Sequence, residues 1–344
     1  MEMQSKQTVR VWFNHWFSTA YYIINLLKQD EQIHFYVIGS NERKYSVIEE
    51  ACDEWYMEPA YGVNEEEYID FCLEFCKEHE INVFAPRRGM LAVVKNRHLF
   101  EAIGVKILAD PDYEKLKRLN NKKETYKFFE QMGIGNVPPY YVVNHVEAFK
   151  RAYERLTSQF KRVCIKFTED EGATSFRVID DRMEGYNSLF TYPGMKMSYE
   201  ALVEALSEQT TFKELMVMPY LEGEEVSIDC LKTSTGIIYV PRIKQGTRIS
   251  QVEYKAVFKT LCEQFYERIG LEGPCNIQLR YHEGMPYLLE VNTRMSGGIQ
   301  QSCLAAQVNI PNIAINALLG NEVPWELCQE TKRISYREEP VRVG

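Results

Sequence analysis

The first 110 residues alternate short apolar runs with amphipathic stretches, and this alternation constrains the fold more than any other feature of the sequence. Four runs predict strands: TVRVWF (8–13), IHFYVI (33–38), INVFAP (81–86) and a shorter one at 105–108. Two stretches between them predict helices, one N-capped by Ser18 and running through Lys28, the other at 65–80. Such alternation is typical of a parallel sheet with helices on both faces.

Ligands bind beyond the carboxyl ends of the strands in sheets of this kind. The predicted strand ends carry Asn14-His15, Ser40-Asn41 and Arg87-Arg88-Gly89. The first glycine of the chain is Gly39, so the first strand–helix turn is not a GxGxxG dinucleotide loop. The sequence also contains no GKS or GKT, no HExxH and no GxSxG, which excludes a Walker-type phosphate loop, a zincin site and a nucleophile elbow.

The remainder of the chain, after a boundary near residues 110–113, mixes strands and helices in an α+β pattern. Helices are predicted at 122–132, ending at Gly133, and at 254–269 and 310–319. Strands are predicted at 162–167, 176–179, 215–218, 225–231 and 237–240, and at 275–281 and 286–292, the last two joined by a turn at 283–284. Arg242, Lys244 and Arg248 are expected to follow the strand at 237–240.

Length and charge restrict the function classes. The 344 residues suffice for about two domains, and a net charge of −9 does not suit binding to nucleic acid or an anionic membrane through bulk charge. Cys72 and Cys76 share a helical face, and core packing is preferred to a metal site because no second Cys/His pair is present. Nine dispersed cysteines, with no apolar leader and no long apolar window, indicate a cytoplasmic protein without a membrane span.

The most informative segment runs from residue 273 to 302. Glu290, Asn292 and Arg294 alternate along one predicted strand and therefore share a face, and Gln278 lies on the preceding strand. Oxygen ligands suit Mg²⁺, and a neighbouring arginine would stabilise the charge of a transferring phosphoryl group. A solvated polar strand face is the alternative. The turn Ser296-Gly297-Gly298 favours the chemical interpretation, because paired glycines let backbone N–H groups approach an anion.

Two lysines and one polar segment complete the candidate site. Lys166 lies in the apolar strand VCIKF, where an ammonium group is costly without a partner or a bound anion. The loop at 168–175 after it is small and polar, and Lys122 opens a helix against the helix dipole. Solvent-exposed lysines are the alternative for both. The segment MPYLEGEE (218–225) runs from one strand into the next. It offers backbone N–H and C=O groups that could form hydrogen bonds with the edge of a planar base.

The order of these features resembles the ATP-grasp superfamily, and within it the branch of the carbamoyl phosphate synthetase large subunit, biotin carboxylase and carboxylate–amine ligases. The match covers nearly the whole chain. The resemblance implies an α/β parallel-sheet domain at 1–112, known in that family as the pre-ATP-grasp domain. It further implies an α+β ATP-grasp domain at 113–344, with a small lid subdomain at about 138–215. The loop after Lys166 departs from the family pattern because it contains a single glycine, and Asn121 precedes Lys122 where the family has Asp.

The resemblance also implies a role for each matching residue. ATP would be bound by Lys122, Lys166, Met218, Leu221, Glu225, Gln278 and Glu290. A metal ion, Mg²⁺ with Mn²⁺ as the alternative, would be held by Gln278, Glu290 and Asn292, and Arg294 would be catalytic. The substrate site is expected at Arg88, Arg242, Ser296, Gly297 and Gly298, whereas Lys244 and Arg248 are taken as surface residues.

The implied activity is an ATP-dependent carboxylate–amine ligase that works through an acyl-phosphate and releases ADP and phosphate. Its partners would be a small carboxylate and an amine, without nucleic acid or membrane, and a homodimer is the assembly suggested by analogy. A bicarbonate-using carboxylase is less favoured because the chain contains no biotin-carrier domain. A nucleotide-binding regulatory or scaffold protein without turnover is the alternative from a different class.

Overall fold

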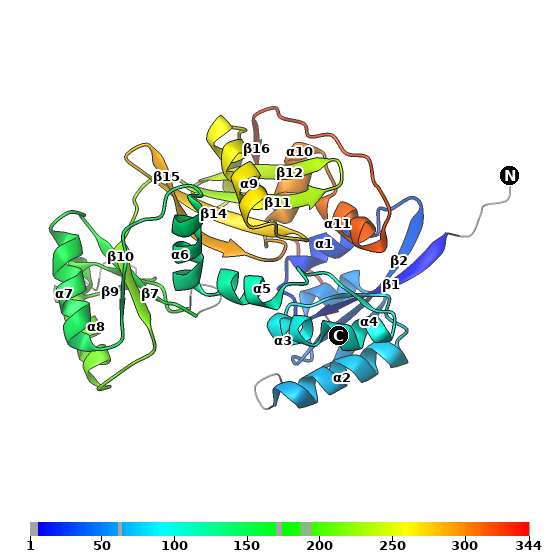
Figure 1. The fold of residues 1–344 in the computed structure, drawn as a ribbon, viewed down its shortest axis with the longest axis horizontal. Coiled ribbons are helices and arrows are strands. Elements are labelled where there is room, and N and C mark those ends of the chain that lie inside the picture. The colour runs from blue at the N-terminus through cyan, green and yellow to red at the C-terminus, as the bar shows by residue number, and fades with distance from the viewer. Residues whose placement is uncertain (1–5, 61–63, 170–173, 187–188, 190–193, 344) are drawn as a thin grey trace. The chain divides into compact units, whose positions relative to one another are not determined.

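The computed structural model describes residues 6–60, 64–169, 174–186, 189 and 194–343 (Figure 1). Part of the predicted loop at 168–175, namely 170–173, lies outside the described residues. The chain divides into two compact units. Unit 1 comprises Met1–Lys117, Val226–Ile277 and Val291–Gly344, and unit 2 comprises Arg118–Glu225 and Gln278–Glu290.

The first sheet of unit 1 is parallel, as the strand–helix alternation predicted. Its order is β3-β2-β1-β4-β5. Starting from the central strand β1, the chain adds β2 and β3 on one side of β1 and then β4 and β5 on the other side. The strands are β1 (Gln7–Asn14), β2 (Ile33–Asn41), β3 (Glu54–Met57), β4 (Val83–Ala85) and β5 (Lys106–Ile107). The connecting helices are α1 (Ala20–Leu27), the 3-10 helix η1 (Val47–Ala51), α2 (Glu65–Glu78), α3 (Met90–Lys95) and α4 (Arg97–Ala102).

A second sheet lies in unit 2, with the order β6-β10-β7-β8-β9. It is antiparallel except for the pair β8–β9. Its strands are β6 (Tyr141–Val143), β7 (Val163–Phe167), β8 (Arg177–Ile179), β9 (Lys196–Met197) and β10 (Leu215–Pro219). The helices of this part of the chain are α5 (Tyr113–Asn120), α6 (Lys122–Met132), α7 (Val146–Thr157), η2 (Asp181–Met183) and α8 (Tyr199–Ser207). The predicted extent of a lid at 138–215 stays a prediction.

The third sheet has the order β15-β14-β11-β12-β13-β16. Its strands are β11 (Glu225–Thr233), β12 (Gly236–Gln245), β13 (Ile249–Val252), β14 (Cys275–His282), β15 (Met285–Asn292) and β16 (Lys332–Ile334). The accompanying helices are α9 (Ala256–Arg268), α10 (Ile299–Ala306) and α11 (Ile310–Leu319). The parallel sheet together with these mixed and antiparallel sheets confirms the predicted fold class.

Two details of the sequence analysis were wrong. Ser18 does not cap α1, whose N-cap is Thr19 without a side-chain hydrogen bond. Arg242 and Lys244 do not follow a strand but lie within β12, because pairing with β13 (Arg242 opposite Val252) extends the ladder to Gln245. The hairpin turn was correctly placed: Glu283 and Gly284 have φ of 48° and 80°, as a tight two-residue turn requires.

Each unit has its own hydrophobic core. In unit 1 the first sheet, α1, α10 and α11 share one cluster that includes Phe13, Ile24 and Ile313. In unit 2 the cluster includes Phe149 and Val217. Cys72 is a fully buried residue on α2, where burial raises the pKa of its thiol. Among the described residues no three side chains of the His, Cys, Asp or Glu type are grouped so that they could hold a metal ion.

No single described helix is long and apolar enough to cross a bilayer. The pair α10 and α11 meets that length and composition only when taken together, and the two are bent by 96°.

Candidate functional site

A first group of predicted site residues lies in unit 2 and is centred on Lys166. This residue is on β7, and its side chain is buried beneath strand β15. The ammonium group donates to the carbonyl of Leu289 at 2.9 Å and to the Tyr126 hydroxyl at 3.5 Å, and it lies 5.2 Å from the centre of the Tyr126 ring. Tyr126 in turn donates to the carbonyl oxygens of Leu288 and Leu289, so α6 and β15 hold the lysine from two sides.

The electrostatic surroundings of Lys166 suit an anion. Burial lowers the pKa of Lys166 to about 8, Glu290 acts in the opposite direction, and the charge of Lys122 lowers the pKa further. Lys122 is itself buried, at the first position of α6. The charge of a bound anion would favour the protonated form of Lys166, which burial and Lys122 disfavour.

The start of α6 explains why Asn121 precedes Lys122. The Asn121 side chain accepts from the backbone N–H of Glu124 at 3.1 Å and so caps the helix, and its amide donates to Glu169 at 3.0 Å. The backbone N–H of Lys122 donates to the carbonyl of Thr168 at the end of β7. An Asp at this position would also cap, so the departure from the family pattern leaves the local structure intact.

The other predicted nucleotide residues of unit 2 lie on β10, β11, β14 and β15. Met218 is on β10 opposite Cys164, Leu221 is buried in the following linker, and Glu225 is the first residue of β11. Gln278 lies on β14 and Glu290 on β15.

Gly223 occupies the glycine position of the GxE segment because of a close contact. Its N–H donates to the carbonyl of Tyr281 at 3.0 Å, and a Cβ at this position would lie 2.4 Å from the same oxygen. Any larger residue would push this linker away from β14.

A second group of predicted site residues lies in unit 1. Arg294 donates to the carbonyl of Met295 at 3.0 Å and to the Asn292 side-chain oxygen at 3.3 Å. Its guanidinium lies 5.2 Å from the centre of the Phe17 ring, and a Cβ on Gly297 would lie 3.1 Å from the Thr19 hydroxyl. The loop between β1 and α1 therefore supports both Arg294 and the Gly297-Gly298 turn. Asn292 ends β15, two residues beyond Glu290 on the same strand.

The predicted substrate residue Arg242 is buried and bound on several sides by other residues of unit 1. It donates to Asp229 at 3.2 Å, to Ser302 at 2.9 Å and to Ser296 at 3.0 Å. A Cβ on Gly298 would lie 2.4 Å from the Arg242 guanidinium, so this glycine is what allows the arginine to approach α10.

Arg88 is placed at the carboxyl end of β4, where the strand order of the parallel sheet reverses. Its guanidinium donates to Glu42 at 2.9 Å, lies 3.4 Å from buried Glu58, and contacts His15 at 3.0 Å. His15 has a left-handed backbone, with φ of 46°. Arg88 is thus surrounded by polar groups at the position where sheets of this kind bind ligands.

Sequence reasoning missed the residues that hold the predicted ones in place. Tyr126 was not identified because a tyrosine in an amphipathic helix looks like a core residue. Asp229 was not among the predicted site residues, although it is the buried counter-ion of Arg242. The alternation of Ser227 and Asp229 on a strand paired with the one carrying Arg242 was the signal that could have revealed this cluster.

Comparisons with known proteins agree with the arrangement above. Residues 211–340 match the family described as ATP-grasp in the biosynthetic pathway with Ter operon. The carbamoyl phosphate synthase large chain of Pseudothermotoga lettingae is 22% identical over 330 residues, which cover 92% of this chain and 28% of that protein. The chain thus spans little more than a quarter of the length of this relative.

Solved structures share the fold. N5-carboxyaminoimidazole synthetase from Staphylococcus aureus, complexed with ADP, matches with a TM-score of 0.70 and 13% identity over 95% of this chain and 82% of that one. The biotin carboxylase domain of 2-oxoglutarate carboxylase from Hydrogenobacter thermophilus, with MgADP and bicarbonate, matches with a TM-score of 0.63 and 16% identity over 94% and 72% of the two chains. These findings confirm the predicted resemblance to the ATP-grasp superfamily and the fold that it implied.

Proposed function

We propose that this protein is an ATP-dependent ligase that joins a carboxylate to an amine. The observation that carries the proposal is the buried Lys166 with Lys122 near it, in a chain whose fold is that of ADP-binding and MgADP-binding enzymes. Lys122, Lys166, Met218, Leu221, Glu225, Gln278 and Glu290 are the proposed ATP-binding residues.

The donor set fits a hard divalent ion. Gln278, Glu290 and Asn292 supply oxygen atoms, which Mg²⁺ and Mn²⁺ prefer, and we assign the metal to them. When bound, the metal would neutralise phosphate charge. The Asn292 oxygen that accepts from Arg294 has a second lone pair, so the hydrogen bond and metal binding are compatible.

The proposed reaction has two steps. An oxygen of the substrate carboxylate forms a bond to the γ-phosphorus of ATP while the bond to the bridging oxygen breaks and ADP leaves. The amine nitrogen then bonds to the acyl carbon, phosphate leaves, and the amine gives up a proton. Arg294 would stabilise the negative charge that develops on the transferring phosphoryl group and on the acyl oxygen. Arg88, Arg242, Ser296, Gly297 and Gly298 remain the proposed substrate residues.

The test is ADP release measured with MgATP and a panel of carboxylates, bicarbonate among them, each with and without a panel of amines. The proposal expects ADP release that requires both an acid and an amine. Glu290→Gln should reduce it by 10²-fold or more, on the scale of losing one stabilising group. Glu283→Gln, on the turn of the same hairpin, is the matched control and should leave it unchanged.

Two other outcomes identify the alternatives. ADP release that needs bicarbonate but no amine would point to the carboxylase chemistry of the Hydrogenobacter domain. MgATP binding without ADP release from any pair would contradict the ligase and favour a regulatory or scaffold protein.

The Hydrogenobacter domain was solved as a dimer, and we propose a homodimer here, to be checked by light scattering.

A further inference from the structure

The strand ends of the parallel sheet in unit 1 meet in one polar cluster around Arg88. The backbone N–H of His15 donates to the carbonyl of Ser40 at 2.8 Å, which ties the end of β1 to the end of β2. The Asn14 side chain accepts from the backbone N–H of Arg87 at 2.6 Å and donates to the carbonyl of Arg88 at 2.9 Å. The backbone from which the Arg88 side chain extends is therefore fixed at the end of β4.

The carboxyl group of Glu58 lies in this cluster with one oxygen hydrogen-bonded and the other not. Its Oε2 accepts from the Ser40 hydroxyl at 2.7 Å, and that hydroxyl accepts from the Trp12 indole at 2.9 Å. Its Oε1 has no hydrogen-bond partner among the residues that the structure describes, although the Arg88 guanidinium lies 3.4 Å away. Nδ1 of His15 also lacks such a partner, and it lies 3.7 Å from Glu58 Oε1. Two buried polar atoms without hydrogen bonds are therefore neighbours, which is rare in a folded protein.

The contact between Arg88 and His15 determines where the imidazole carries its proton. Nη2 of Arg88 lies 3.0 Å from Nε2 of His15. A guanidinium has only donors, so Nε2 accepts and carries no proton. The neutral imidazole therefore has its proton on Nδ1, the atom beside Glu58. A second proton on His15 would have to enter at Nε2, where the resulting cation would repel Arg88.

Acidification changes the charge of both groups, first of Glu58 and then of His15. Burial raises the pKa of Glu58 to about 7, whereas burial and the charge of Arg88 lower the pKa of His15. The His15 side chain is 30% exposed, so protons can reach the cluster even though the Glu58 side chain is fully buried.

The other ionisable groups around this pair keep their charge between pH 6 and pH 8. Three neighbouring guanidinium groups stay cationic, those of Arg43, Arg87 and Arg88. Arg88 lowers the pKa of Glu42, which therefore stays ionised. Tyr68 and Cys72 on α2 stay neutral, because burial raises the pKa of both side chains. The charge of the cluster in this range therefore depends on His15 and Glu58.

We propose that His15 and Glu58 form a proton switch that holds Arg88 above neutral pH and releases it on acidification. At pH 8 the ionised Glu58 and the Nε2 lone pair of His15 both attract Arg88. Near pH 6 Glu58 is largely protonated and attracts Arg88 only weakly, and further acidification places a positive charge on His15. Arg88 then becomes available to an anionic group of a ligand. The switch rests on the proposed function only in that Arg88 is a proposed substrate residue there.

Reaction of the full chain with phenylglyoxal, an arginine-specific reagent, measures this release. Peptide mass spectrometry gives the ratio of modified Arg88 to modified Arg337, whose side chain is 88% exposed and corrects for the pH dependence of the reagent. The ionised fraction of a carboxyl group with a pKa of about 7 falls from about 0.9 at pH 8 to about 0.1 at pH 6. We expect the ratio to rise by about threefold or more over this range.

Two variants assign the effect to Glu58. Glu58→Gln cannot ionise and should give the high ratio at both pH values. Glu42→Gln is the matched control, because it removes the other carboxylate that accepts from Arg88 and should still show the rise between pH 8 and pH 6. A wild-type ratio that does not change with pH, or an equal change in Glu58→Gln, would overturn the proposal.

Nitrogen-15 magnetic resonance of the histidine rings gives a second readout, which a merely structural role of His15 would not move. At pH 8 the His15 ring should carry its proton on Nδ1, and a proton on Nε2 would overturn the proposal. His15→Asn identifies the signals, because asparagine tolerates the left-handed backbone at φ of 46°. The preference for Nδ1 should disappear in Arg88→Met and persist in Arg87→Met, the matched control.

Neither readout involves MgATP or turnover, so the two claims fail separately. A failure of the switch leaves the proposed ligase standing. An absence of ADP release from every acid and amine overturns the ligase and leaves the switch intact.

Discussion

Lys166 is the residue whose charge state matters most for the proposed function. A lysine with a pKa of about 8 is only partly charged at pH 8.5, and a nucleotide polyphosphate would favour the charged form. We therefore expect MgATP binding at pH 8.5 to take up a proton, and the affinity to fall as pH rises through 8. Calorimetry in two buffers of different ionisation enthalpy measures this uptake. Lys166→Arg keeps the charge at all these pH values and should show no uptake; equal uptake in both proteins would assign the proton elsewhere.

Glu58 gives unit 1 a stability that depends on pH. Burial raises the pKa of Glu58 to about 7, although Ser40 donates to it at 2.7 Å and Arg88 lies 3.4 Å away. Because the folded pKa lies above the unfolded one, the stability that this group contributes is complete below about pH 4.5 and is lost as pH rises through 7.

We expect wild-type stability to fall by up to about 3 kcal/mol between pH 5 and pH 8 on account of Glu58. Urea unfolding at the two pH values measures this change, and Glu58→Gln should flatten it. Glu42→Gln is the control. Arg88 lowers the pKa of Glu42, so the titration of Glu42 changes the stability only below the range from pH 5 to pH 8. An equal fall with pH in Glu58→Gln and wild type would contradict the assignment.

At the scale of elements, the GxE linker depends on one glycine contact. In Gly223→Ala the new methyl group would meet the Tyr281 carbonyl at 2.4 Å, and a backbone oxygen cannot move aside as a side chain can. We expect a loss of about 1–3 kcal/mol, the usual cost of overpacking, measured by urea unfolding. Gly104→Ala is the comparison: its φ of 81° strains an alanine, but nothing lies within 4 Å of the new methyl group. A smaller loss for Gly223→Ala than for Gly104→Ala would show that the linker can shift.

The elements that the sequence predicted well are those with explicit end signals. Helix α6 begins after the Asn121 cap and ends at Gly133, whose φ is 60°, and α11 begins after Asn309 and ends at Gly320. The parallel sheet followed from apolar runs buried on both faces. The short strand β16 was missed because its pairing is long-range, with Ile334 opposite Ser250 on β13, and leaves no local pattern.

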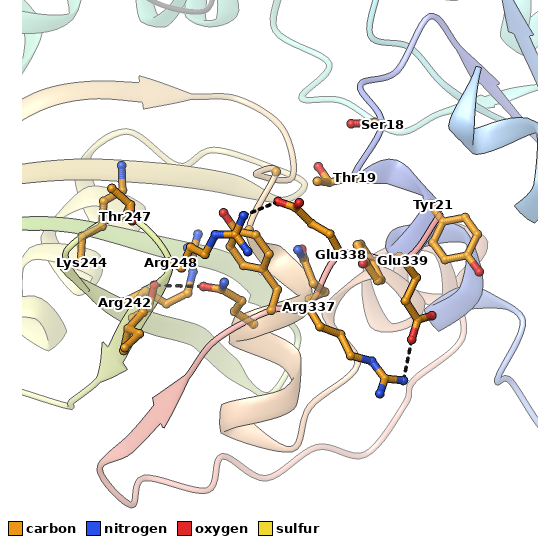
Figure 2. Close-up of a pocket in the computed structure, with 18 of the residues that line it drawn as sticks. Ser18, Thr19, Tyr21, Arg242, Lys244, Thr247, Arg248, Arg337, Glu338 and Glu339 are labelled. Carbon is orange, nitrogen blue, oxygen red and sulfur yellow. Dashed lines mark hydrogen bonds and ion pairs between the residues drawn. The ribbon is translucent and has the colours of Figure 1, made fainter. Parts of the chain in front are cut away.

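Among the predicted site residues, too, the sequence indicated only what local patterns determine. Strand alternation placed Glu290 and Asn292 correctly on β15, and the apolar surroundings of Lys166 correctly indicated burial. The sequence could not show that Lys244 and Arg248 share a cavity wall with residues 336–341 (Figure 2), because a contact across 90 residues depends on tertiary packing.

At the scale of the whole molecule, the chain passes repeatedly between the two units. It crosses after Lys117, Glu225, Ile277 and Glu290, and the last two crossings lie within strands β14 and β15. A unit cannot unfold without taking apart strands that continue into the other. We therefore expect a single calorimetric unfolding transition, and two separate transitions would contradict this coupling.

The proposed metal ligand Glu290 belongs to unit 2 and follows Glu283 on the same hairpin. A nucleotide with its metal bound at Glu290 should stabilise the protein against thermal unfolding. At 100 times its Kd, MgATP should add about 2.7 kcal/mol, which for a chain of this size raises the Tm by a few degrees. Glu290→Ala should lose that shift while Glu283→Ala, on the turn of the same hairpin, keeps it. A shift that persists in Glu290→Ala, or that appears equally without Mg²⁺, would remove this carboxylate from the proposed metal site.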